Sequence, residues 1–157
     1  MLSKPKIEVR PIQSKRELDD MYYQRWLVLR APLGMHRGTE KDKHDKSAFH
    51  LVAVCEDKII GSARLRQLSV ELGSIAYVAV LSEFRSQGLG TKLIKKLIEE
   101  AQEKNLKSLR LMARINTLGF YKQIGFLEQG KIFDFMGIPH IFMYVNLPPS
   151  GDNAGVQ

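Results

Sequence analysis

The chain has 157 residues, 44% of them apolar, which is enough for one ordinary hydrophobic core, so we expect a single domain over residues 1–147. No apolar run is long enough to span a membrane, and the charged start lacks the apolar segment of a secretory signal, which predicts a cytoplasmic protein. The 24 Lys and Arg residues outnumber the 17 Asp and Glu residues, giving a net charge of +7. This charge suits an anionic partner, either nucleic acid or a phosphorylated cofactor, and it equally fits a surface whose charge serves only solubility.

The first third of the chain predicts a strand, a helix and a long loop. Residues 6–12 alternate weakly between polar and apolar, which indicates a short strand. Ser14 followed by Glu17 is a capping-box pattern, so a helix is expected to begin there. Residues 30–46 break the helical period with proline, glycine and many charges, which predicts a surface loop or short helices.

Strands and helices then follow one another along the chain. Two β-branched runs joined by Glu56 and Asp57 predict a hairpin, and Asn105 is expected to end an amphipathic helix that starts at Leu89. The proline- and glycine-rich residues 148–157 are expected to be disordered. The predicted strands are 49–55, 58–65, 75–80, 108–112, 126–133 and 140–147, and a second short helix is predicted at 117–124. This order indicates an α/β fold with one mixed sheet.

The segment FRSQGLGTKLIKKLIEEAQ, residues 84–102, places an arginine and two glycines directly before the amphipathic helix. The first N–H groups of a helix have no partner within it, and glycines allow a bulky diphosphate to approach the backbone, so this turn can bind an anion. A tight turn without a ligand is the alternative interpretation. A dinucleotide fold would need a third glycine where Leu93 stands, and a nucleotide-triphosphate loop would need Gly-Lys-Ser/Thr; both patterns are absent.

Arg85, Gly88 and Gly90 follow the strand YVAVLSEFR, and NTLGFYKQIGF comes after the next predicted strand. In this order the three motifs resemble the GNAT family of acyl-CoA-dependent N-acyltransferases, and the resemblance covers roughly residues 50–147. It implies a mixed, mostly antiparallel sheet of six or seven strands, splayed between the fourth and fifth, with helices on both faces. The sequence departs from the family at Arg114, where many members have asparagine, while Asn116 lies only five residues before the motif's tyrosine.

The resemblance implies an enzyme that transfers an acetyl group from acetyl-CoA to a primary amine by direct attack, without a metal. It also implies that Tyr121 protonates the departing thiolate, since the pKa of a phenol, about 10, and of a thiol, about 8.5, are close. The diphosphate would lie on the glycine turn, and the pantetheine arm would pair with the fourth strand as an added strand does. The residues implied to bind acetyl-CoA are Val78, Ala79, Val80, Arg85, Ser86, Gln87, Gly88, Leu89, Gly90 and Thr91.

The sequence does not single out a general base. Candidates in segments on the acceptor side are His36, Glu40, Asp42, Asp45, His50 and His140. We expect the charged loop 30–46 to line the amine pocket, with Glu40 or Asp45 attracting the ammonium group. Cys55 lies in an apolar run and is expected to be a buried structural thiol.

Two other functions are open at this stage. A basic nucleic-acid-binding module would fit the charge, but the lysines of the second helix alternate with glutamates and no aromatic residues are interleaved for base stacking. A GNAT-like fold that binds acyl-CoA without turnover is also compatible, since fold does not fix activity. The acceptor amine, the acyl length and the formation of a homodimer are not indicated by any feature of the sequence.

Overall fold

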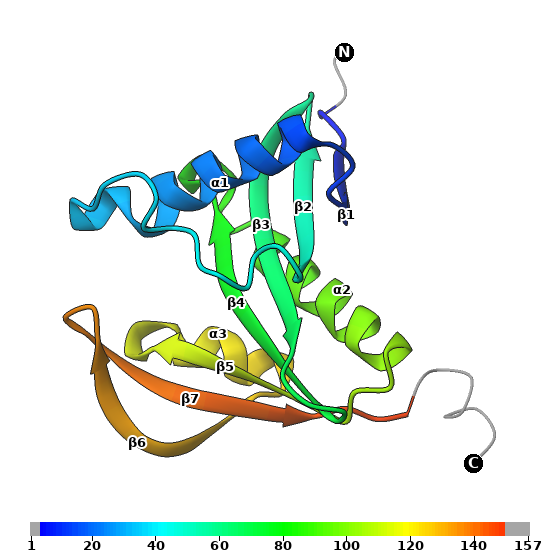
Figure 1. Cartoon of the computed structure of the whole chain (residues 1–157), viewed down its shortest axis with the longest axis vertical. Helices are drawn as coiled ribbons and strands as arrows, with labels where there is room; N and C mark the ends of the chain where they lie inside the picture. The colour runs from blue at the N-terminus through cyan, green and yellow to red at the C-terminus, as the bar shows by residue number, and fades with distance from the viewer. Residues whose placement is uncertain (1–3, 150–157) are drawn as a thin grey trace. The chain divides into compact units, whose positions relative to one another are not determined.

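The computed structural model describes residues 4–149, so the end of the predicted tail, residues 150–157, lies outside the described residues. The described chain has an α/β fold with a seven-stranded sheet in the order β1-β2-β3-β4-β5-β7-β6 (Figure 1). The strands are β1 (Ile7–Pro11), β2 (Phe49–Cys55), β3 (Lys58–Gln67), β4 (Leu72–Val80), β5 (Ser108–Arg114), β6 (Leu127–Phe135) and β7 (Ile138–Asn146). The helices are α1 (Lys15–Leu29), α2 (Leu89–Glu103) and α3 (Leu118–Ile124), with short 3-10 turns η1 (Ala31–Leu33), η2 (Ser82–Phe84) and η3 (Ile115–Thr117).

The sheet is mixed, as predicted. The pairs β1–β2, β2–β3, β5–β7 and β6–β7 are antiparallel, whereas β4 and β5 are parallel. The chain folds into two compact units: an N-terminal unit of residues 4–66 and 77–97, and a C-terminal unit of residues 67–76 and 98–149. Each unit contains part of β4 and part of α2.

The start of α1 follows the predicted capping pattern. The Ser14 hydroxyl accepts a hydrogen bond from the Glu17 N–H at 3.1 Å, and the Gln13 N–H donates to the Glu17 carboxylate at 2.9 Å. Arg10 of β1 holds the same carboxylate with two hydrogen bonds, at 2.6 and 2.9 Å. The first turn of α1 is therefore fixed both by its own cap and by the neighbouring strand.

In the N-terminal unit the sheet lies between two helices. Residues of β3 from Ile59 to Leu65 are all buried, because alternate side chains meet different helices. The Ser62 hydroxyl donates to Gln24 of α1, whereas a Cβ built on Gly61 would lie 3.3 Å from Leu93 of α2. Figure 1 shows α1 crossing this part of the sheet. The predicted helices on both faces are thus present here.

The C-terminal unit contains the parallel pair of strands. The register of β4 with β5 runs from Leu72↔Ser108 to Ile75↔Leu111 and ends there, although both strands continue. Tyr77 then has a φ of +55°, an uncommon angle for a residue other than glycine. The parallel register with β5 therefore covers only the first four residues of β4.

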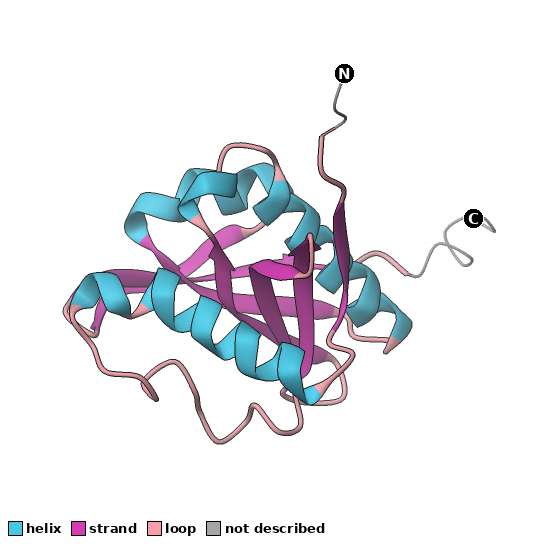
Figure 2. Cartoon of the chain, turned by 90° about the horizontal axis from the view of Figure 1, so that it is seen from above, coloured by secondary structure: helices cyan, strands magenta, loops and turns pink. Residues whose placement is uncertain are grey.

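Several strand boundaries differ from the sequence-based expectation, by up to three residues. The strand predicted at 75–80 begins at Leu72, whose carbonyl accepts hydrogen bonds from the N–H groups of Leu68 and Ser69 in the preceding turn. The loop after η1 contains only turns up to residue 48, and Figure 2 draws it in pink, without helix or strand. Pro148 lies in the described chain, and its carbonyl accepts a hydrogen bond from Gln102 at 3.1 Å.

Candidate functional site

The predicted glycine turn joins β4 to α2 through two residues with positive φ. Ser86 has a φ of +63° and Gly88 one of +76°. The first backbone hydrogen bond of α2 runs from the Lys92 N–H to the Gly88 carbonyl at 3.0 Å. The amides of residues 89–91 precede this bond, so the helix has no carbonyl of its own for them. Together with the helix dipole, these amides form a positively polarised surface.

The space around this turn is open. A Cβ built on Gly88 would meet no heavy atom within 4 Å, so a side chain there would project into free space. Leu89 is buried and anchors the start of α2 in the core, leaving its amide at the turn. Arg85 is exposed, and its Nε donates to the Val80 carbonyl at 3.3 Å. This hydrogen bond of Arg85 connects the turn to the end of β4. All ten residues predicted to bind acetyl-CoA belong to the N-terminal unit.

A buried relay of hydrogen bonds holds the end of β4. The Ala79 carbonyl accepts from the Gln24 side chain at 3.1 Å, and the Ser62 hydroxyl donates to the Gln24 side-chain oxygen at 2.6 Å. Gln24 is only 2% exposed. Sequence reasoning missed this residue, although it lies three positions after Met21 on the apolar face of α1, where a polar side chain needs a partner.

Tyr121 lies on α3 in the C-terminal unit. Its ring packs edge-on against Phe120 and Phe126, with centroids 4.9 and 6.0 Å apart. Burial raises the pKa of Tyr121 to about 12, although the nearby charge of Arg114 acts in the opposite direction. The phenol is therefore protonated at every physiological pH. Asn116, the alternative to the family's asparagine, is exposed in η3.

A second group of polar residues in the N-terminal unit surrounds the ring of Tyr77, and we call it the Tyr77 cluster. Its members are Arg25, Arg30, Asp42, Asp45, His50, Arg64 and Tyr77, drawn from α1, the following loop and the strands β2, β3 and β4. The guanidinium carbons of Arg25, Arg64 and Arg30 lie 4.1, 4.7 and 5.6 Å from the ring centroid. The Tyr77 hydroxyl donates to Asp42 at 3.3 Å.

Asp45 is held by two arginines in the interior of this cluster. Arg25 and Arg64 each donate to its Oδ1 at 3.1 Å, and the Asp42 N–H donates to its other oxygen at 2.8 Å. Burial favours the neutral carboxyl, but these three donors outweigh it and lower the pKa of Asp45. Asp45 is thus a buried, permanently charged partner of the arginines.

The prediction that Glu40 or Asp45 attracts the acceptor's ammonium group is wrong for this structure. Glu40 is 0% exposed and Asp45 is 5% exposed, because both side chains turn inward instead of facing solvent. The Glu40 carboxylate accepts a hydrogen bond from the Gly38 N–H at 2.7 Å and lies 3.7 Å from Arg37. Both carboxylates therefore stabilise the loop itself.

The histidines do not supply an obvious base. Arg25 donates to Nδ1 of His50, so this ring is neutral and carries its proton on Nε2, which donates to the Asp45 carbonyl at 2.8 Å. Burial, with Arg25 nearby, lowers the pKa of His50 and keeps it neutral. His140 is buried with Nδ1 2.7 Å from the Ile138 carbonyl, and His36 is exposed. Cys55 is buried, as expected.

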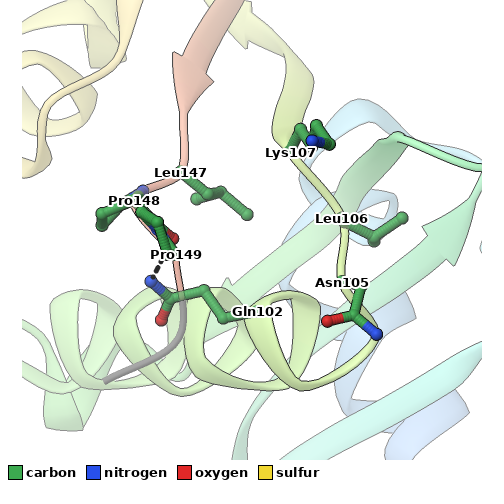
Figure 3. A pocket seen from close by; sticks show the side chains of 7 residues that line it. All are labelled: Gln102, Asn105, Leu106, Lys107, Leu147, Pro148 and Pro149. Carbon is green, nitrogen blue, oxygen red and sulfur yellow. Dashed lines mark hydrogen bonds between the residues drawn. The ribbon is translucent and has the colours of Figure 1, made fainter. Parts of the chain in front are cut away.

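A pocket of about 270 Å³ in the C-terminal unit contains none of the predicted site residues (Figure 3). It is lined by Gln102, Asn105, Leu106, Lys107, Leu147, Pro148 and Pro149. Within residues 4–149, no three His, Cys, Asp or Glu side chains are grouped to hold a metal ion. No helix in that range has the length and apolar character needed to cross a membrane.

Known proteins with similar sequences and structures agree with this geometry. The acetyltransferase (GNAT) domain matches residues 34–147. The uncharacterized N-acetyltransferase YitI of Bacillus subtilis (strain 168) is 30% identical over 140 residues, which cover 85% of this chain and 94% of that protein.

Solved structures show the same fold. Escherichia coli ElaA has a TM-score of 0.80 at 22% identity, covering 89% of this chain and 99% of that one. A GNAT family acetyltransferase from Elizabethkingia anophelis with acetyl-CoA bound has a TM-score of 0.70 at 21% identity, covering 90% and 98%. From the domain match and the relative in Bacillus subtilis, this chain belongs to the GNAT family of acetyltransferases.

Proposed function

We propose that this protein transfers an acetyl group from acetyl-CoA to a primary amine by direct attack of the amine on the thioester. The observation that carries this proposal is the turn before α2, where the amides of residues 89–91 precede the first hydrogen bond of the helix and the space around Gly88 is open. Acetyl-CoA supplies the activated acyl thioester, and no covalent bond to the protein is required.

The turn fits the diphosphate of coenzyme A. Backbone N–H groups at a helix N-terminus bind phosphate oxygens, and the helix dipole favours negative charge there. Gly88 allows close approach because it has no Cβ, and its φ of +76° suits glycine. The exposed Arg85 and Lys92 add positive charge around the turn. An uncharged acyl donor would gain nothing from this arrangement.

The end of β4 fits the pantetheine and the thioester. In this proposal the backbone groups of Val78, Ala79 and Val80 pair with the pantetheine amides, and one N–H donates to the thioester carbonyl oxygen as negative charge develops there. The Gln24 relay fixes the Ala79 carbonyl, so the peptide groups of the strand are oriented before the substrate arrives.

Tyr121 acts as the general acid in this proposal. The amine nitrogen, after losing its ammonium proton to solvent, bonds to the acyl carbon; the carbon–sulfur bond breaks, and the Tyr121 hydroxyl donates its proton to the departing sulfur. The nitrogen releases a second proton to solvent, which leaves the neutral amide. Solvent then restores the proton of Tyr121. Because burial raises the pKa of Tyr121 to about 12, the donor is always protonated before the step.

The test compares Gly88→Ala with Gly137→Ala. Both glycines have nearly the same φ, +76° and +77°, and both face open space, so each substitution costs a similar amount of backbone strain. Only the Cβ at Gly88 occupies the proposed diphosphate position. We expect Gly88→Ala to weaken acetyl-CoA binding at least tenfold in calorimetry, while Gly137→Ala leaves it unchanged. Equal affinities in two folded variants would exclude this turn as the diphosphate site.

A further inference from the structure

Three arginines but only two carboxylates meet in the Tyr77 cluster. Arg25 and Arg64 share Asp45, and Arg64 also pairs with Asp42 at 2.7 Å. Arg30 is 8% exposed and has no carboxylate within ion-pair distance in residues 4–149. Its Nε donates instead to a backbone carbonyl of the following loop at 3.1 Å. One positive charge of this largely buried cluster is therefore unbalanced, and a buried charge without a partner is costly.

No neighbouring side chain supplies the missing negative charge. His50 is neutral, as its two hydrogen bonds require. Tyr77 is a neutral phenol, because its hydroxyl donates a hydrogen bond to Asp42. The Glu40 carboxylate lies 3.7 Å from Arg37, whose charge it balances. The excess charge of the cluster is thus one, and a ligand with a single negative charge would neutralise it.

Two guanidinium nitrogens are available to such a ligand. The Nη2 atoms of Arg30 and Arg64 make no hydrogen bond within the described chain. Among the described residues, the arginine nitrogens that are buried and lack a hydrogen-bond partner are Nε of Arg25 and Nε of Arg64. The Nη2 atoms of Arg30 and Arg64 also lack a partner but are not buried in this way, so they are exposed to solvent. Their guanidinium groups lie 5.6 and 4.7 Å from the same Tyr77 ring, so the two arginines present donors around one aromatic ring.

We propose that the acceptor amine carries a carboxylate group, which binds the Nη2 donors of Arg30 and Arg64 beside Tyr77. This inference rests on the proposed acyl transfer, since Tyr77 directly precedes the β4 residues 78–80 assigned to the acyl donor. A carboxylate has the one negative charge that the cluster lacks, and its planar oxygens suit guanidinium N–H donors. The second charge of a phosphate monoester would exceed the imbalance.

The first experiment uses the unmodified protein with matched acceptors. The kcat/KM values are compared for an α-amino acid and its carboxamide, which differ in the carboxylate, and for an amino-alkyl phosphate and the corresponding amino alcohol. Charge-assisted hydrogen bonds in a partly buried site predict a preference of about tenfold or more for the carboxylate over the carboxamide. The phosphate should give a smaller preference.

Variants assign the preference to the cluster. Arg30→Gln removes the unbalanced charge and should bring the ratio of kcat/KM for the carboxylate acceptor to that for the carboxamide close to one. Arg30→Lys keeps the charge and should retain part of the preference for the carboxylate. The matched control is Arg16→Gln on α1, where the side chain is 81% exposed and pairs with Asp20. This control should leave the ratio unchanged.

The outcomes separate this inference from the proposed function. Equal kcat/KM values for amino acids and their carboxamides, or a preference for the phosphate-bearing acceptor, would overturn the inference while leaving acyl transfer intact. If no amine is acetylated, the proposed function fails, and the inference is then decided by binding: an amino acid should still raise the melting temperature of the wild type, but not of Arg30→Gln. Absence of that difference overturns it.

Discussion

Replacing Tyr121 with phenylalanine removes one hydroxyl and keeps the ring that packs between Phe120 and Phe126. With the pKa of Tyr121 at about 12 and that of a thiol at about 8.5, complete proton transfer to a solvent-exposed thiolate is uphill by roughly 5 kcal/mol. A thiolate leaving in the same desolvated surroundings is itself more basic, which narrows the gap. The hydroxyl thus stabilises the departing sulfur chiefly by a hydrogen bond that becomes a proton transfer late in the step.

We expect Tyr121→Phe to bind acetyl-CoA as the wild type does and to lower kcat about 100-fold or more, the usual size of a general-acid contribution. The assay is thiol release under conditions where chemistry limits the rate. An acyl donor with a more acidic thiol should recover most of the loss. Tyr121 stays protonated up to a pH near 12, so its ionisation should not reduce the wild-type rate at any pH below 10. Equal losses with good and poor leaving thiols would refute the general-acid role.

Two further predictions concern stability. Asp45→Asn leaves two buried arginines without their shared carboxylate, so the free energy of unfolding should fall by about 3–5 kcal/mol, which lowers Tm by roughly 10–15 °C for a chain of 157 residues. Asp19→Asn, in an exposed pair, should lower the free energy of unfolding by less than about 0.5 kcal/mol. Similar melting temperatures for the two variants would contradict the buried pairing. Glu17→Gln should lower the free energy of unfolding by about 1 kcal/mol at pH 7, because hydrogen bonds from Arg10 stabilise the charged carboxylate and lower the pKa of Glu17 from 4.5 to about 2. This contribution of the wild-type pair is fully present above pH 5 and disappears as the pH falls towards 2. Urea unfolding at several pH values measures it, and a difference between wild type and variant that does not shrink in acid would argue against the pair.

Local signals explain which parts of this protein could be predicted from sequence. The cap at Ser14, the glycine turn and the end of α2, which stops two residues before Asn105 with its φ of +62°, each depend on a few adjacent residues whose conformational preferences are strong. The start of β4 at Leu72 was missed because it depends on pairing with β5, more than thirty residues later in the chain. Pairing between distant segments leaves little trace in a single sequence.

The Tyr77 cluster is the main feature that sequence reasoning did not find. Arginine is rarely buried, so Arg25 and Arg64 are expected at the surface when only composition is considered. A usable signal existed at Arg25, which lies four residues after Met21 on the apolar face of α1. The same cluster explains why Glu40 and Asp45 were assigned wrongly: a charged loop suggests solvent, whereas here it folds inward over buried arginines.

Acetyl-CoA-dependent thiol release with a panel of primary amines tests the central claim most directly. The proposed function predicts that thiol release requires both acetyl-CoA and an amine, and that one acetylated amine forms for each free thiol. Binding of acetyl-CoA without thiol release above background, across amines with and without a carboxylate, would instead identify a GNAT fold that binds acyl-CoA without turning it over.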